Sequence, residues 1–341
     1  MFVARNIFLT TDTAPPPSSF TGMTFNHCNQ TGRNGPVFST CDTYYTANNN
    51  TEYSSLTNFA VSFGYQSFDI PAGTYSVTMD GACGGSTSNT SITGWNAFAT
   101  GSRRHARGAR ATFTLTVTSG LTLTMVIGQK GGDSTSSLHN PGGGGGTFLV
   151  AGTYAQVSAG TPTDELICAV GGAGGYNGPQ GGSNNYTSAE GQTTTSGVSA
   201  SGTAGTNGNG GNASTFAANS SGGAGYFTNS SSGTVDGFGA TSFQLYAWGF
   251  RNGAVGAQHA ATDYSSRGGF GGGGGGSTSS GRDEDKGGGG GYSGGGYAFD
   301  AYNFGGGGGS IINSSGTGWS TSGGSLTRGG GAGLNGQIIF S

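Results

Sequence analysis

The chain has 341 residues, of which 76 are glycine, and only 8% are charged. Its hydrophobic fraction of 32% lies well below the roughly 45–50% of ordinary globular domains, so a conventional apolar core can organise only part of it. The net charge of −3 excludes a general attraction for nucleic acid, and no apolar run is long enough to span a membrane.

Residues 2–11 carry apolar side chains at Phe2, Ala4, Ile7 and Leu9, a pattern close enough to alternation to predict a β-strand. The sequence TDTAPPPSS that follows is a stiff, extended spacer, so residues 1–19 are predicted to form an arm separate from the body. Two interpretations of this arm stay open. It folds back on its own domain, or it adds to a sheet of the next molecule in strand-addition assembly.

Residues 20–341 are predicted to form a single composite domain that begins as an antiparallel β-sandwich. Residues 20–53 look loop-like, and residues 59–80 predict two strands around a Pro-Ala-Gly turn. Alternation predicts further strands at residues 111–118, 121–128, 147–154 and 165–170, and the last residues, GQIIFS, look like a strand that returns to the sandwich. With no sustained helical period, the only helical turn expected lies at residues 244–250. The sandwich takes about residues 20–140 plus returning strands, and a glycine-rich part takes about residues 141–341.

Residues 267–310 contain four glycine blocks. Because glycine loses more backbone entropy on ordering than any other residue, this tract is either a flexible linker or is ordered by something other than side-chain burial. Aromatic residues punctuate the blocks, at Phe270, Tyr292, Tyr297, Phe299, Tyr302 and Phe304, and flexible linkers rarely carry them. The composition therefore favours the ordered alternative, a bundle of polyglycine II helices that pair N–H and C=O groups with their neighbours.

The four cysteines are Cys28, Cys41, Cys83 and Cys168. An even number without CxxC spacing fits two disulfides better than a zinc site. The short separation of Cys28 and Cys41 favours a local bridge, although four cysteines allow three pairings.

Several motifs, taken in their order along the chain, resemble a known family. They are FNHCNQTGRNGPVFSTC, FDIPAGTYSVTMDGACGG, LTMVIGQKGGD, PGGGGGTFLVAG, ELICAVGGAGGY and RGGFGGGGGG. The run resembles the glycine-rich extracellular region of the anaplastic lymphoma kinase and leukocyte tyrosine kinase receptors, from about residue 20 onward.

This resemblance implies an all-β fold, a TNF-like antiparallel β-sandwich with an inserted bundle of polyglycine II helices, and a Cys28–Cys41 bridge. Cys83 and Cys168 stand where the family has apolar or small residues. Each ends a strand that enters a glycine segment, and we predict that they form a second disulfide. No kinase domain, transmembrane helix or EGF-like module follows in this sequence, so the cytokine-binding role of the receptors does not carry over directly.

Charged residues gather in two places. One is a basic patch, which contains Arg103, Arg104, His105, Arg107 and Arg110. Three interpretations stay open: a binding surface for acidic or sulfated glycans or an acidic protein, a solvated loop, and, if the loop is exposed, a site for a processing protease. The other is the acidic run Asp283, Glu284 and Asp285 between Arg282 and Lys286, which is predicted to be a solvated loop tip because it lacks the ligand spacing of a calcium loop.

No catalytic, cofactor or metal site is predicted. The histidines His27, His105, His139 and His259 have no second ligand at metal-binding spacing, and no nucleophile–base pair stands out. Four exposed rings could stack on sugars or else coat the glycine bundle: Tyr292, Tyr297, Tyr302 and Trp319.

Eight N-x-S/T sequons mark candidate glycosylation sites, at Asn29, Asn49, Asn89, Asn185, Asn212, Asn219, Asn229 and Asn313. Together with the cysteines they favour a secreted glycoprotein. The expected function is a non-enzymatic structural subunit of an extracellular filament or matrix, with copies of itself as partners and no membrane insertion. The alternatives are a receptor-like ligand-binding module and a carbohydrate-binding adhesin at the tip of a fibre.

Overall fold

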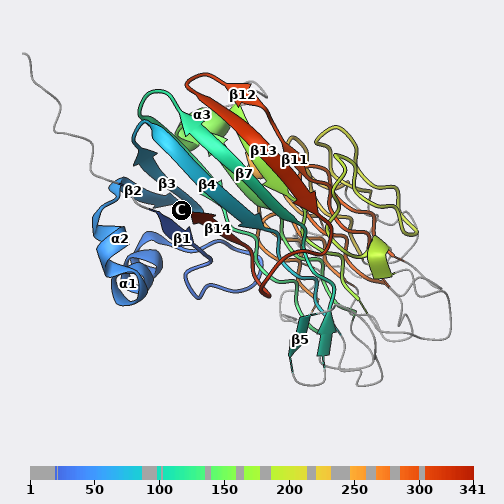
Figure 1. Cartoon of the computed structure of the whole chain (residues 1–341). Coiled ribbons are helices and arrows are strands. Elements are labelled where there is room, and N and C mark those ends of the chain that lie inside the picture. The colour runs from blue at the N-terminus through green and yellow to red at the C-terminus, as the bar shows by residue number, and fades with distance from the viewer. Residues whose placement is uncertain are drawn as a thin grey trace, which may run out of the picture.

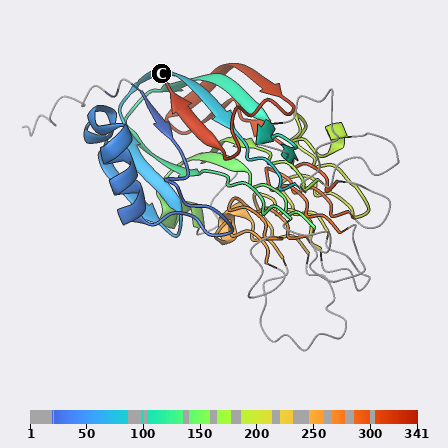
Figure 2. The ribbon, with the colours of Figure 1, turned by 90° about the horizontal axis from the view of Figure 1, so that it is seen from below.

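The computed structural model describes residues 20, 22–86, 98–100, 103–134, 140–158, 165–176, 186–212, 220–231, 246–258, 266–276, 285–298 and 304–341. Within these residues the chain is mostly β, as predicted. Two antiparallel six-stranded sheets pack face to face as a sandwich, and the glycine segments continue beyond one end of it (Figures 1 and 2).

The two sheets take their strands from distant parts of the chain. The first has the order β1 (Met23–Phe25), β14 (Gln337–Phe340), β4 (Gly73–Asp80), β7 (Arg110–Val117), β13 (Trp319–Thr327) and β12 (Ser315–Gly316). The second has the order β11 (Ile311–Ile312), β10 (Leu166–Val170), β9 (Thr147–Ala151), β8 (Leu121–Val126), β3 (Tyr65–Ile70) and β2 (Thr57–Ser62). A separate hairpin joins β5 (Phe98–Thr100) to β6 (Arg103–His105).

Alternation explains why these segments are strands. In β7 every second residue is buried, and these side chains face the second sheet across the sandwich core. Four strands predicted from alternation are confirmed as β7 to β10, with small shifts at their ends. They were expected at residues 111–118, 121–128, 147–154 and 165–170. Strand β13, with the sequence WSTSGGSLT, was not expected, because its outward residues are polar and two glycines interrupt it.

The prediction that residues 20–53 form a loop is wrong for the second half of this segment. Two helices lie there, α1 (Phe38–Asn48) and α2 (Asn50–Ser54). In α1 only Cys41 and Tyr45 are buried, four residues apart, so the helix has no sustained apolar stripe that periodicity could detect. The Tyr45 ring packs edge-on against Phe25 at 6.0 Å. The remaining helical elements are short: α3 (Tyr154–Ser158) and 3₁₀ turns at Tyr186–Ser188 and Phe250–Asn252, next to the turn expected at 244–250.

The predicted Cys28–Cys41 disulfide is confirmed, and it ties the start of α1 to the segment after β1. The predicted Cys83–Cys168 disulfide is wrong, because both residues are buried free thiols. Cys168 lies in β10 of the second sheet, whereas Cys83 follows β4 of the first sheet and its Sγ donates to the Gly333 carbonyl at 3.3 Å. The two cysteines are thus associated with strands of different layers.

Thiol titration checks this correction. In the native protein neither Cys83 nor Cys168 should react quickly, because both are fully buried and burial raises the pKa of the Cys83 thiol to about 12. Denaturation without reductant should expose two thiols, and adding reductant should release two more from Cys28 and Cys41. No free thiol in the unfolded, unreduced chain would contradict the assignment.

The glycine segments form a second part of the molecule, here called the glycine body. It consists of residues 81–86, 128–134, 140–146, 171–176, 186–212, 220–231, 246–258, 266–276, 285–298 and 304–310. Strands β4, β8 and β10 run directly into it, and β9 and β11 leave it. Sandwich and glycine body therefore alternate along the chain, on both sides of residue 140.

Backbone hydrogen bonds hold the glycine body together, and their partners rotate with a period of three residues. Along residues 287–292 successive N–H groups donate to three different segments in turn, and the cycle then repeats. Gly287 and Gly290 donate to Pro141 and Gly144, Gly288 and Gly291 to Ser221 and Ala224, and Gly289 and Tyr292 to Gly306 and Gly309, at 2.9–3.3 Å. The N–H groups of residues 305–310 show the same rotation of acceptors. They donate in turn to carbonyls in the segments 172–175, 293–296 and 188–194. Each such segment is thus surrounded by others and has its backbone satisfied.

Close approach, rather than backbone torsion, requires glycine in these segments. Glycines 287–291 and 305–309 all have negative φ, which any residue can adopt. A Cβ on Gly308, however, would lie less than 3.0 Å from the backbone of Gly290, and one on Gly174 would meet Gly305 in the same way. The segments can lie this close only because they carry no side chains.

Aromatic rings join the glycine body to the outer face of the second sheet. Tyr65 and Phe148 extend from that face, and Phe250 lies between them from the glycine body, with ring centroids at 5.3 and 4.8 Å. The Tyr65 hydroxyl donates to the Phe250 carbonyl. This aromatic cluster is fully buried, so the two parts share one apolar interface.

Candidate functional site

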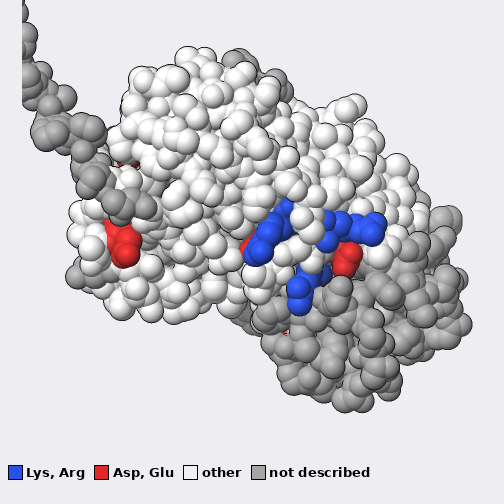
Figure 3. Space-filling model, viewed as in Figure 1, with Lys and Arg blue, Asp and Glu red and all other residues white. Residues whose placement is uncertain are grey.

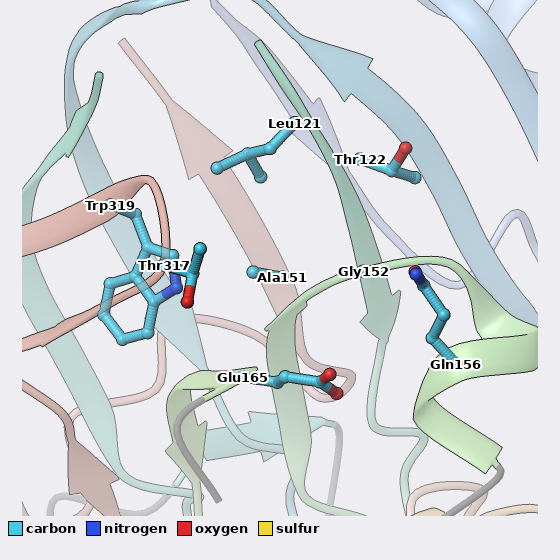
Figure 4. A pocket seen from close by; sticks show the side chains of 8 residues that line it. All are labelled: Leu121, Thr122, Ala151, Gly152, Gln156, Glu165, Thr317 and Trp319. Atoms are coloured by element: carbon cyan, nitrogen blue, oxygen red, sulfur yellow. The ribbon is translucent and has the colours of Figure 1, made fainter. Parts of the chain in front are cut away.

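A pocket of about 310 Å³ opens at the end of the sandwich away from the glycine body (Figure 4). Five elements meet there: the start of β8, the end of β9, α3, the start of β10 and the β12–β13 hairpin. The residues that line it are Leu121, Thr122, Ala151, Gly152, Gln156, Glu165, Thr317 and Trp319.

Two glycine turns shape the pocket. Gly152 has φ +122°, donates its N–H to the Thr122 carbonyl at 2.8 Å, and accepts from the Thr124 hydroxyl at 2.6 Å. Gly318 has φ +80° and turns the chain between β12 and β13. These left-handed positions favour glycine, and they place Thr317 and Trp319 opposite Gln156.

The chemistry of the pocket is that of binding. One carboxylate, one amide and two threonine hydroxyls stand around an indole ring and the aliphatic side chains of Leu121 and Ala151. The Gln156 Oε1 accepts from the Thr153 N–H at 2.8 Å, which fixes the amide in one orientation. None of the lining residues is a histidine, cysteine or serine.

Sequence analysis had singled out only Trp319 among these residues, as a ring that could stack on sugar. It lies in the sandwich core and is only 3% exposed, so an edge rather than a face is available. The other lining residues could not be found from the sequence, because five separate elements supply them and no spacing links them.

The predicted basic patch does not form one surface within the described residues. The guanidinium of Arg110 binds both carboxylate oxygens of Asp80, at 2.7 and 2.9 Å. Arg107 lies near the carboxylate of Glu190. Arg103 and Arg104 belong to β6, and their side chains lie outside the described residues. Figure 3 shows a few basic groups beside acidic ones on this face, and otherwise uncharged surface.

Glu190 provides a test of this electrostatic arrangement. Burial raises the pKa of its carboxyl above the ordinary value of 4.5, and Arg328 and Arg107 oppose the shift. The folded state therefore holds this proton more tightly than the unfolded state. As a result, Glu190 adds to the free energy of unfolding as the pH falls through the raised pKa towards 4.5. We expect wild type to gain stability relative to Glu190→Gln over that range in urea titrations. Parallel pH profiles for the two proteins would contradict the assignment, and Arg328→Gln should enlarge the gain.

The acidic run was predicted to be a solvated loop tip, and this is wrong for the two residues that the structure describes. Asp285 is fully buried and Lys286 is 1% exposed, because Lys286 pairs its backbone with Ala298 inside the glycine body. Arg282, Asp283 and Glu284 lie outside the described residues.

The predicted sugar-stacking rings in the glycine body are coating residues. Tyr297 is 7% exposed, and its ring fills the space beside Gly202. Tyr292 packs against the aromatic interface with the second sheet. Tyr302 lies outside the described residues.

The two described histidines serve structural roles. His105 is buried with Nδ1 at 3.1 Å from the Gly84 carbonyl and 3.6 Å from Asp133. His27 lies 3.2 Å from the Asn335 amide, and burial lowers its pKa. Among the described residues no group of histidine, cysteine, aspartate and glutamate is arranged to hold a metal ion. His139 and His259 lie outside them.

The described sequons differ in exposure. Asn29 and Asn212 are exposed, whereas Asn49, Asn229 and Asn313 are half-buried. The side-chain amide of Asn313 donates to the Leu166 carbonyl at 2.6 Å, and the Asn229 Oδ1 accepts from the Gly249 N–H at 2.9 Å. Asn89, Asn185 and Asn219 lie outside the described residues.

Comparison with known proteins identifies no relative. No protein-family model matches the chain, and no curated protein matches it. None of the helices in the described ranges is both long enough and apolar enough to cross a membrane.

Proposed function

We propose that the chain is a non-enzymatic structural subunit that works outside the cell and assembles with copies of itself. The glycine body carries this proposal. Its buried segments are tied backbone to backbone in three directions, which makes a stiff block with few side chains for a protease to recognise.

The segments of the glycine body are, in this proposal, polyglycine II helices. The period of three in their hydrogen-bond partners supports this, because such a helix has three residues per turn and no internal hydrogen bonds. The resemblance to the glycine-rich region of the anaplastic lymphoma kinase and leukocyte tyrosine kinase receptors belongs to the same proposal, and with it the TNF-like character of the sandwich.

An extracellular setting fits two further observations. The Cys28–Cys41 disulfide is typical of an oxidising compartment. Two sequons, at Asn29 and Asn212, stand at exposed positions where a glycan could be attached.

Two measurements on the full-length chain test the proposal. Amide hydrogen exchange should be slow throughout residues 287–291 and 305–309, because their N–H groups are bonded and buried. Exchange at random-coil speed would remove the stiff block. Light scattering and electron microscopy should show oligomers or filaments, and a monomer at every concentration would contradict self-assembly.

A second candidate function, a carbohydrate-binding adhesin, is favoured by the pocket at the end of the sandwich. Its carboxylate, amide, hydroxyls and indole are groups that pair with the hydroxyls and apolar faces of sugars. A glycan array should then show binding that Glu165→Gln and Gln156→Ala weaken. Thr327→Ala, an exposed change on β13, should leave it unchanged. An array without any bound glycan would remove this candidate.

A further inference from the structure

The edges of the two sheets differ in how well they are protected. Among the described strands β1, β11 and β12 end the sheets with only two or three residues each, whereas β2 ends the second sheet with six. The sequence of β2, TNFAVS, contains no charged residue and no proline, two of the usual devices that keep an edge strand from pairing with another chain. Its own irregularity lies between Thr57 and Ala60, so Ala60–Ser62 is the regular part of this edge. Beyond β12 the outer side of β13 is interrupted by a bulge between Ser322 and Ser325.

The exposed large apolar side chains of the described residues gather around this strand. They are Val37, 59% exposed, Phe38, 47% exposed, and Phe63, 81% exposed. Phe38 packs on Phe59 of β2 with ring centroids 6.2 Å apart, and Phe63 directly follows the strand. We call β2 together with these three side chains the β2 edge. Figures 1 and 2 show β2 on the side of the molecule that carries α1 and α2. The turn after β2 reaches the glycine body, where a Cβ on Gly64 would lie 2.6 Å from the Phe270 ring.

Val37 belongs to the β2 edge because the backbone brings its segment to the end of β2. A Cβ on Gly35 would lie less than 3.0 Å from the Cα of Gly64, so these two glycines are in direct contact. Val37 follows the first of them by two residues, and Phe63 precedes the second. The three exposed apolar side chains thus surround one strand end rather than lying scattered over the surface.

Phe63 is also held in an unfavourable backbone conformation. It has φ +51° in the two-residue turn between β2 and β3, where Gly64 has φ +87°. Asparagine or glycine is the usual residue at such a position. The ring gains little burial in return, since its one described ring contact is with Tyr154 at 5.8 Å. A residue that is both strained and exposed indicates a use outside the isolated fold.

We propose that the β2 edge binds residues 2–11 of a second copy of this chain as an added strand. Those residues, FVARNIFLTT, are rich in apolar, aromatic and β-branched side chains, as a strand that covers an apolar edge requires. Phe20, where the described chain begins, is anchored in the sandwich by Phe68 at 5.4 Å and Tyr75 at 5.8 Å. The nineteen residues before it can span up to roughly 60 Å when extended, enough to reach a neighbouring molecule.

This inference rests on the proposed function, because it supplies the contact that self-assembly needs. The Pro15–Pro16–Pro17 spacer suits the role, since a stiff linker keeps the donor strand extended from its own sandwich. Backbone hydrogen bonds to β2 would provide the affinity, and Val37, Phe38 and Phe63 would cover the apolar side chains of the donor.

Cross-linking between two variants of the full chain, each with one added cysteine, tests the assignment, since the native thiols Cys83 and Cys168 are buried. One carries Asn6→Cys in the donor segment and the other Ala60→Cys at an exposed position of β2. A short bismaleimide, which tolerates small shifts of register, should join them only when the two are mixed. A matched variant with Ser322→Cys, exposed on β13, should not be joined to Asn6→Cys.

The outcomes separate this inference from the proposed function. Assemblies that form without Asn6→Cys to Ala60→Cys products would overturn the inference and leave the structural role standing. If only two Ala60→Cys chains were joined to each other, β2 would pair with β2 of the second copy. That result would overturn the assignment of residues 2–11 as the added strand. If a cross-link formed only within one chain that carries both Asn6→Cys and Ala60→Cys, the arm would fold back on its own sheet. That result would overturn the claim that the added strand comes from a second copy. Absence of any assembly would remove the proposed function itself.

Substitution of Phe63 provides an independent check. Phe63→Asn should weaken self-association at least about tenfold, since it removes an exposed apolar anchor. Its thermal stability should be unchanged or raised, because Asn-Gly suits this turn. Phe63→Trp, which keeps a ring, should retain assembly. Equal self-association of wild type and Phe63→Asn would overturn the role of this residue.

Discussion

Replacing Gly289 by alanine is expected to destabilise the protein by at least about 3 kcal/mol. Gly289 lies in the middle of a buried segment, and a Cβ there would lie less than 3.0 Å from the backbone of Gly172 and Ala173. The neighbour is main chain, so it cannot turn aside as a flexible side chain could. Its N–H donates to Gly306 at 2.9 Å and its carbonyl accepts from Gly295 at 2.9 Å, so a shift of the segment would break both bonds. Urea denaturation of the two proteins would measure the loss.

Gly120→Ala is the matched control for this change. Gly120 has negative φ, is exposed, and offers a Cβ nothing nearer than the Ile70 carbonyl at 3.7 Å. The alanine should therefore be neutral or stabilise slightly, because it restricts only the unfolded chain. Similar losses for Gly289→Ala and Gly120→Ala would show that close packing of main chains does not govern the glycine body.

Replacing Asp80 by alanine is expected to lower the free energy of unfolding by about 3 kcal/mol. This is the lower end of the effect of breaking a buried ion pair, because Arg110 keeps some contact with water. The Asp80 side chain is fully buried, and that of Arg110 is 32% exposed. The same carboxylate accepts from the Gln337 amide at 2.8 Å and from the Ala332 N–H at 3.3 Å. Its removal leaves three groups without their acceptor, at the point where β4, β7 and β14 meet the glycine body.

A double-mutant cycle separates the ion pair from the rest of this effect. The double variant Asp80→Ala with Arg110→Ala should lose less unfolding free energy than the two single variants together, by at least about 1 kcal/mol. Each single change already breaks the ion pair, so the second change cannot break it again. Asp69→Ala, which removes a partly exposed carboxylate from the adjacent sheet, is the control and should cost much less. Strict additivity of the Asp80 and Arg110 changes would contradict the coupling.

The sandwich could be predicted from the sequence because its strands obey a local rule. In β7 the burial of successive residues follows the apolar pattern closely, and the predicted starts of β7 and β8, at 111 and 121, differ from those of the strands by at most one residue. Helix α1 breaks that rule. Its sequence, FSTCDTYYTAN, is held by one disulfide and one tyrosine, whose partners Cys28 and Gln66 lie outside the helix.

Pairings between layers could not be predicted, and the cysteines show why. Cys83 and Cys168 share a similar local context, a strand that enters a glycine segment, yet those strands, β4 and β10, belong to different sheets. The pocket has the same character: Glu165, Gln156 and Trp319 meet only because the ends of β10 and β13, from different sheets, lie beside the short helix α3. Local patterns indicate which segments are strands, whereas these sites depend on how the strands are ordered in the sheets.

The rotation of hydrogen-bond partners within the glycine body limits how its sequence can change in length. One residue inserted into 287–291 would turn every later amide by a third of a helical repeat, towards the wrong neighbour. Three inserted residues would restore the register and lengthen the segment by one full repeat. Segments of this kind should therefore gain or lose residues in triplets, and other length changes should fall in the connectors between them.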